Sequence, residues 1–200
     1  MKQLLAVIFI ILCLPELKAD RWSIAQTREF YSSDSSYFVR IVPIEIPKRY
    51  YKWKNAPNWR KKMFSPADTT IIPCYAEMYK STTNGDSLVW TRKLVNTIAP
   101  VSAKVSNDGR YMVTLDDWGG NRPTGENAVV IYGVDGNLLK QYSLLEISPF
   151  PLDSYDVSVT SFHWYGGSSF IDNKSFRLYF KTKIKQLYNF TYYIDSQELR

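Results

Sequence analysis

The stretch from residue 94 to residue 145 alternates short apolar runs with turn residues, and this pattern restricts the possible folds more than any other feature. The dipeptides Asp108-Gly109 and Asp135-Gly136 favour hairpins, because Asp and Gly tolerate the positive φ angles of primed turns. No part of the chain after residue 20 shows a long, sustained helical stripe. The pattern predicts an antiparallel meander of four strands, over residues 101–105, 110–115, 127–132 and 138–143.

Two other parts of the chain repeat this layout more weakly. Each copy has a polar turn with an aspartate, followed by a small or polar residue, an aromatic residue and apolar residues. The aspartates of the three copies are Asp34, Asp108 and Asp172. The copies predict three units within one domain over residues 20–200, at about 24–94, 95–148 and 155–200. Because hairpins of any β-protein can share this layout, chance similarity is the alternative.

The unit at 101–145 resembles the WD40-type and YVTN-type repeats of β-propellers, as they occur in uncharacterised secreted bacterial proteins. The resemblance rests on Asp-Gly turns followed by apolar strands, and it is faint at 28–46 and 157–195. It implies an all-β fold of antiparallel four-stranded meanders that form partial propeller-like blades. The sequence lacks the Gly-His and Trp-Asp dipeptides of WD40 repeats, and the resemblance transfers no catalytic residue. Since a closed propeller has roughly four to eight blades, an oligomer could complete the ring.

The composition supports a folded β-domain and excludes several other classes of protein. Hydrophobic residues make up 45% of the chain and aromatic residues 16%. Tyr, Phe and Trp fit a half-buried sheet surface better than a helix face. These values exclude a disordered chain, a collagen-like repeat and a disulfide-rich miniprotein, and the length of 200 residues suits one globular domain.

Residues 1–19 have the pattern of a secretory signal peptide. Lys2 precedes an apolar run at 4–14, Pro15 ends the run, and Ala19 is a small residue before the predicted cleavage site. The run is too short to span a membrane, which takes about 20 apolar residues. A buried N-terminal helix is the alternative. We therefore expect a secreted protein, periplasmic or extracellular, with no transmembrane segment in the mature chain.

Residues 48–62 are the most unusual stretch of the sequence, because seven basic residues occur there without an acidic one. Five prolines between residues 43 and 73 break up the surrounding region. They predict a long insertion between the second and third strands of the first unit, and long insertions in compact domains are often functional. The candidate ligand-binding residues are Lys48, Arg49, Tyr51, Lys52, Trp53, Lys54, Trp59, Arg60, Lys61 and Lys62.

Basic groups interleaved with aromatic rings are typical of a surface that binds a polyanion. The cations attract phosphate or sulfate, and the rings stack on sugars. In a secreted protein we expect an anionic glycan, an envelope surface or a protein partner as the ligand, and no nucleic acid. The stretch therefore predicts a non-catalytic binding module. The alternative is a solvated loop whose rings pack onto the sheet while its charges face water.

Two other functions stay open from the sequence. A hydrolase acting on an envelope polymer would need His163, or the adjacent Asp116 and Asp117, in a concave pocket. A structural component of a larger assembly would use open sheet edges instead. The oxygen-rich loop 116–127 matches no EF-hand pattern, so we expect no metal ion, and we expect no organic cofactor. Cys74, the one cysteine after residue 19, is interpreted as a half-buried apolar thiol.

Overall fold

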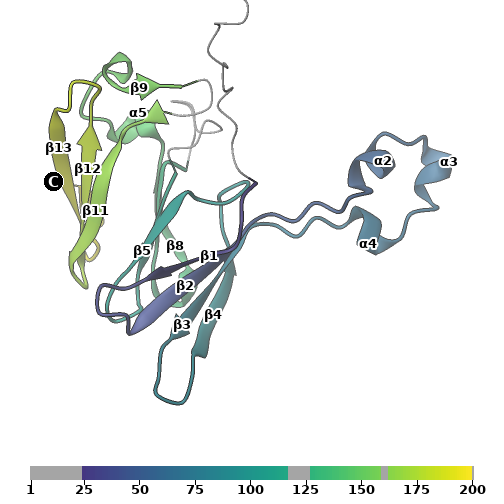
Figure 1. The fold of residues 1–200 in the computed structure, drawn as a ribbon, viewed down its shortest axis with the longest axis horizontal. Coiled ribbons are helices and arrows are strands. Elements are labelled where there is room, and N and C mark those ends of the chain that lie inside the picture. Colours follow the sequence, from purple (N-terminus) through teal and green to yellow (C-terminus); the bar gives the residue numbers. More distant parts are fainter. Residues whose placement is uncertain (1–23, 117–126, 159–161, 200) are drawn as a thin grey trace, which may run out of the picture.

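The computed structural model describes residues 24–116, 127–158 and 162–199, and Figure 1 shows how they are arranged. Three antiparallel sheets of four strands and one of two strands make up most of the described chain. The prediction of an all-β fold of antiparallel four-stranded meanders is therefore confirmed. The signal peptide predicted at residues 1–19 lies outside the described residues.

The first sheet has one face that packs in the core and one that carries charged side chains. Val39, Ile41 and Met78 are buried on the core side, while Arg40 lies opposite Glu77 on the other side. This alternation follows from the two-residue period of a strand. In spatial order the strands are β1 (Arg28–Tyr31), β2 (Tyr37–Val42), β3 (Tyr75–Lys80) and β4 (Ser87–Lys93).

The second sheet lies between the other two, and its two central strands are buried on both faces (Figure 1). Met112 and Tyr132 pack with the first sheet, whereas Val113 and Ile131 pack with the third. A strand that is covered on both sides needs few polar positions, which explains why Thr114 alone interrupts the apolar runs of its two central strands. In spatial order the strands are β5 (Ser102–Val105), β6 (Met112–Leu115), β7 (Val129–Tyr132) and β8 (Leu138–Tyr142).

The third sheet is rich in aromatic residues on its inner face. Phe176, Phe180 and Tyr192 pack there with the fully buried Trp164. Its strands are β11 (Tyr165–Asp172), β12 (Ser175–Lys181), β13 (Leu187–Tyr193) and β14 (Glu198–Leu199). In the second sheet, η2 (Val134–Gly136) connects β7 to β8. After β8 the chain reaches the third sheet through α5 (Leu144–Ile147), η3 (Leu152–Ser154) and the paired strands β9 (Asp156–Val157) and β10 (Phe162–His163).

The first strands of the three sheets are neighbours in space. Strand β1 lies beside β5, and β5 lies beside β11. Successive strands then run outward within each sheet, so that the sheets are arranged like adjacent blades of a propeller.

The three aspartates that mark the sequence repeats occupy the same position in each sheet, at the first hairpin. Each side-chain oxygen accepts a hydrogen bond from the backbone N–H two residues further on, at 3.1 Å for Asp34, 3.1 Å for Asp108 and 2.7 Å for Asp172. This Asx-turn geometry is a standard way to stabilise a tight turn. The repeat seen in the sequence is therefore a repeat of turn chemistry.

The two Asp-Gly turns differ in backbone conformation. Asp135 and Gly136 both have positive φ angles, 59° and 70°, as a primed turn requires. At the other turn Gly109 has a φ of 66°, but Asp108 is not in the left-handed region. The prediction of a primed turn is wrong at Asp108-Gly109, because that hairpin has a longer loop closed by Ser106 and Tyr111.

Candidate functional site

The connection between β2 and β3 leaves the sheets and ends in a separate cluster of helices (Figure 1). We call residues 43–73 the arm and residues 48–69 the head. Across the arm, the N–H groups of Glu45 and Ile72 each donate to the other residue's carbonyl oxygen, at 2.8 and 3.0 Å. At the base, the N–H of Ile44 donates to the carbonyl oxygen of Ile98 at 2.9 Å. The arm is thus a two-stranded extension of the first sheet that carries the head outward.

Three short helices, rather than an irregular loop, form the head. Proline suits the start of a helix because its fixed φ angle is helical and its missing N–H is not needed there. Pro57 directly precedes one of these helices, and Pro66 begins another. None of the three contains a buried residue, and helices this short are unstable alone. The helices are α2 (Tyr50–Lys54), α3 (Asn58–Lys61) and α4 (Pro66–Thr69).

Arg49 connects the two ends of the head. Its guanidinium group donates to Asp68 Oδ2 at 3.2 Å, and its central carbon lies 4.9 Å from the centroid of the Phe64 ring. Asp68 also accepts from the N–H and the hydroxyl of Ser65, at 3.1 and 2.9 Å, and so caps α4. The bonds from Ser65, with the charge of Arg49, lower the pKa of Asp68. Arg49 therefore belongs to the framework of the head, where any anionic ligand would compete with Asp68.

The head has no buried side chain in its helices, and contacts between aromatic rings hold it together instead. The rings of Tyr50 and Trp53 are half-buried, with centroids 5.5 Å apart. Lys61 Nζ lies 5.8 Å from the centroid of the Trp53 ring. These rings pack on each other and not on the sheets, which differs from the solvated-loop interpretation of the sequence. Trp53 and Lys61 are candidate residues whose contacts also support the head.

The remaining candidate residues point into solvent. Tyr51 is 58% exposed and Trp59 is 70% exposed. Within the described ranges, no ion pair involves any of the basic side chains of the head except Arg49. The exposed candidates without such a pair are Lys48, Tyr51, Lys52, Lys54, Trp59, Arg60 and Lys62.

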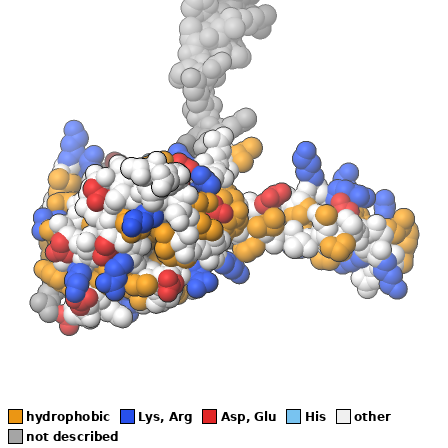
Figure 2. Space-filling view, turned by 90° about the horizontal axis from the view of Figure 1, so that it is seen from below, with side chains coloured by type: hydrophobic (Ala, Val, Ile, Leu, Met, Phe, Trp, Pro, Cys, Tyr) orange, Lys and Arg blue, Asp and Glu red, His pale blue; other side chains and the backbone are white. Residues whose placement is uncertain are grey.

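The head carries the entire formal net charge of the protein. It contains seven basic residues and one acidic residue, Asp68. Subtracting these from the 25 basic and 19 acidic residues of the chain leaves 18 of each, so the rest of the chain is formally neutral. Figure 2 shows Lys and Arg side chains gathered with hydrophobic side chains over the projecting arm.

Sequence reasoning missed Met63, which directly follows the basic stretch. Its side chain is 73% exposed. The sequence offered a signal, since Met63 follows Trp59 by four residues, which is the spacing of neighbours on one helix face. That signal depended on predicting α3, and a four-residue helix leaves no periodic pattern to detect.

The two described residues that were considered for catalysis, Asp116 and His163, differ in their exposure to solvent. Asp116 is 7% exposed, and the amide nitrogen of Asn96 donates to its Oδ2 at 3.4 Å. The Thr114 hydroxyl in turn donates to the Asn96 amide oxygen at 3.4 Å. His163 is exposed on β10. Asp117 and the rest of the oxygen-rich loop, to residue 126, lie outside the described residues.

In the described part of the chain, neither Cys74 nor a cluster of metal-ligating side chains forms a reactive centre. The Cys74 thiol is 1% exposed, and burial, with a smaller contribution from the Asp116 charge, raises its pKa to about 12. A thiol with so high a pKa stays protonated and unreactive at neutral pH. Among the described residues, no group of three or more His, Cys, Asp and Glu side chains could hold a metal ion.

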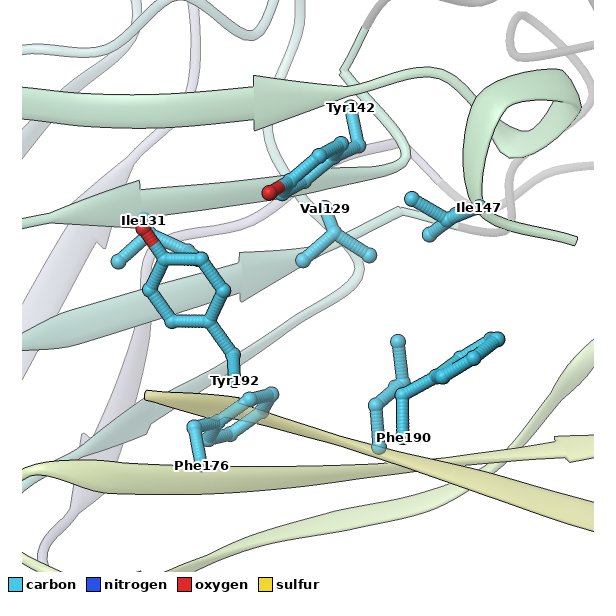
Figure 3. A pocket seen from close by; sticks show the side chains of 8 residues that line it. Val129, Ile131, Tyr142, Ile147, Phe176, Phe190 and Tyr192 are labelled. Atoms are coloured by element: carbon cyan, nitrogen blue, oxygen red, sulfur yellow. The ribbon is translucent and has the colours of Figure 1, made fainter. Parts of the chain in front are cut away.

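A small gap in the core separates the second and third sheets (Figure 3). It encloses about 10 Å³, which is room for no more than one water-sized sphere. The gap is too small for an organic ligand, so it is a packing defect of the core. Its lining is formed by Val129, Ile131, Tyr142, Ile147, Phe176, Leu178, Phe190 and Tyr192.

Comparisons with protein-family models and with curated protein sequences find no match, so the structure itself must support any functional argument. Within the described ranges, no helix has the length and apolar character needed to cross a bilayer.

Proposed function

We propose that the protein is a secreted, non-catalytic binding module whose head binds an anionic surface of the cell envelope or an anionic glycan. One observation supports this most directly: the arm carries a cluster of basic side chains, with no described ion pair except that of Arg49, away from the sheets. The rings of Tyr51 and Trp59 are exposed in the same cluster. A polyanion can approach these groups without contacting the neutral remainder of the chain.

The mechanism is electrostatic attraction followed by ring contact. A concentrated positive charge raises the local concentration of an anionic ligand and speeds its association. Exposed charges are screened over about 8 Å at physiological ionic strength, so the binding should weaken as salt is added. Because the head contains only one acidic side chain, little within it opposes the attraction.

The first test neutralises the head without removing the framework residues Arg49 and Lys61. We expect the substitutions Lys48→Gln, Lys52→Gln, Lys54→Gln, Arg60→Gln and Lys62→Gln together to abolish binding to a sulfated glycan and to anionic envelope extracts. Far-UV circular dichroism and the melting temperature should not change, because these side chains are exposed. Binding isotherms at about 0.05 M and 0.5 M salt measure the effect, and the wild type should bind only at the lower salt concentration.

A matched control changes the same amount of charge on the sheets. It replaces the exposed lysines Lys80, Lys93, Lys140, Lys181 and Lys185 with glutamine. This variant should bind like the wild type, because the position of the charge and not its total is what matters. Equal losses in both variants, or binding that survives in the head variant, would place the site elsewhere. Turnover of an envelope polymer, or a mass that rises with concentration, would support a hydrolase or an assembly component instead.

A further inference from the structure

We infer that the ligand of the head is the surface of an anionic lipid bilayer, into which the side chains of Trp59 and Met63 insert at the level of the lipid headgroups. This inference rests on the proposed function and specifies its ligand. It depends on the geometry of α3, on the chemistry of the neighbouring side chains and on the position of the head at the end of the arm.

Trp59 and Met63 lie within one helical turn of each other. Lys62, which follows α3, keeps α-helical backbone angles of −64° and −12°. The N–H of Met63 then donates to the carbonyl oxygen of Arg60, three residues earlier, at 3.0 Å, so that a tighter 3₁₀ turn follows α3 and ends at Met63. The two side chains are 70% and 73% exposed, so one short segment presents two large apolar side chains to water.

These two apolar side chains lie at the end of the arm, next to exposed cations. Figure 1 places α3 at the end of the arm, further from the sheets than α2 and α4. Arg60 and Lys62 lie between Trp59 and Met63 in the sequence and are both exposed. Exposed apolar side chains have an energetic cost in water, and where several gather they mark surfaces that bind a partner or a membrane.

The chemistry of the head favours lipid over a glycan. Sugar hydroxyls are usually bound by carboxylate and amide groups that fix their orientation. The one carboxylate of the head, Asp68, is already occupied by Ser65 and Arg49. The groups left for that role are therefore neutral ones such as the amides of Asn55 and Asn58. Tryptophan, by contrast, prefers the boundary between water and lipid, and methionine is a flexible apolar side chain. Basic residues beside such side chains are typical of segments that lie on anionic membranes.

The test compares vesicles with a soluble polyanion. Purified protein is sedimented with vesicles of phosphatidylcholine and phosphatidylglycerol at about 7:3, and with vesicles of phosphatidylcholine alone. In parallel, binding to dextran sulfate is measured. We expect partitioning onto the anionic vesicles only, and quenching of tryptophan fluorescence when brominated lipids are included. Any contribution of the apolar run at residues 4–14 is common to all variants.

The decisive variant is Trp59→Ser with Met63→Ser, which keeps every charge. It should lower the vesicle partition coefficient at least about tenfold, because the two inserted side chains are lost, and should weaken dextran sulfate binding by a clearly smaller factor, because every charge that attracts the soluble polyanion is kept. The control variant Leu145→Ser with Ile184→Ser removes two side chains of the sheet region that are 64% and 76% exposed. It should partition like the wild type.

The outcomes separate this inference from the proposed function. If dextran sulfate binds but anionic vesicles do not, the lipid inference is wrong and the polyanion-binding function stands. The same conclusion follows if the Trp59 and Met63 variant partitions like the wild type. If neither dextran sulfate nor vesicles bind, both proposals are wrong.

Discussion

Two buried tyrosines, Tyr132 and Tyr192, differ in whether their hydroxyl groups form a hydrogen bond. The Tyr132 hydroxyl accepts a hydrogen bond from the N–H of Val95 at 3.1 Å. The Tyr192 hydroxyl is buried and has no hydrogen-bond partner among the described residues. Figure 3 shows the Tyr192 ring extending from the third sheet toward the second, into the gap described above. In both cases burial is the main cause that raises the pKa to about 12.

The same substitution should therefore have opposite effects at these two positions. Tyr192→Phe should raise the free energy of unfolding by up to about 1 kcal/mol, because it removes a buried hydroxyl that makes no bond. Tyr132→Phe should lower it by about 1–2 kcal/mol, because it leaves the Val95 N–H without its acceptor. Urea denaturation measures both, and each midpoint should shift while the slope of the transition stays constant. A loss of stability in Tyr192→Phe would show that its hydroxyl is bonded after all.

The first hairpins of the first and second sheets contain the same hydrogen-bonded turn. Ser32 and Ser106 each donate from the hydroxyl to the aspartate two residues on, at 2.7 Å in both cases. The two turns also touch, because the hydroxyl of Ser33 donates to the side-chain oxygen of Asn107 at 2.8 Å. This junction connects neighbouring sheets through their turns.

Glycine is needed at one of these turns and not at the other. Gly109 has a φ of 66°, and a Cβ atom there would lie 2.2 Å from Cδ1 of the Tyr37 ring. Gly109→Ala should lower the free energy of unfolding by about 2 kcal/mol or more, through backbone strain and displacement of the ring. The corresponding residue of the first turn is Ser35, which is exposed and has a φ of 59°. Ser35→Ala is the control, and calorimetry should show a melting temperature close to that of the wild type.

The elements that could be predicted from the sequence are those with a periodic pattern or a turn signal. The strands of the second sheet fall within the four predicted ranges, because their apolar runs are flanked by Asp-Gly turns. The helices of the head could not be predicted, since four or five residues give no helical period and the head has no buried face. The role of Arg49 depends on Asp68, nineteen positions away, and only the fold brings the two together.

At the scale of the whole molecule, the sheets and the arm are energetically separate. The two clusters of buried hydrophobic residues lie on either side of the second sheet. Within the described residues, neither cluster contains a residue between positions 43 and 73. The arm is joined to the sheets by its two chains and by the bond from Ile44 to Ile98. The sheets therefore supply the stability, and the arm supplies the charged surface.

This separation predicts that the arm can be shortened without loss of the fold. Glu45 and Ile72 exchange two backbone hydrogen bonds, which is the closing pair that a two-residue hairpin loop requires. Replacing residues 46–71 with Asn-Gly should leave the midpoint of urea denaturation within the equivalent of about 0.5 kcal/mol, because no buried residue is removed. The same variant should lose all binding to dextran sulfate and anionic vesicles. A shortened protein that unfolds would show that the arm stabilises the sheets, and one that still binds would move the binding surface onto them.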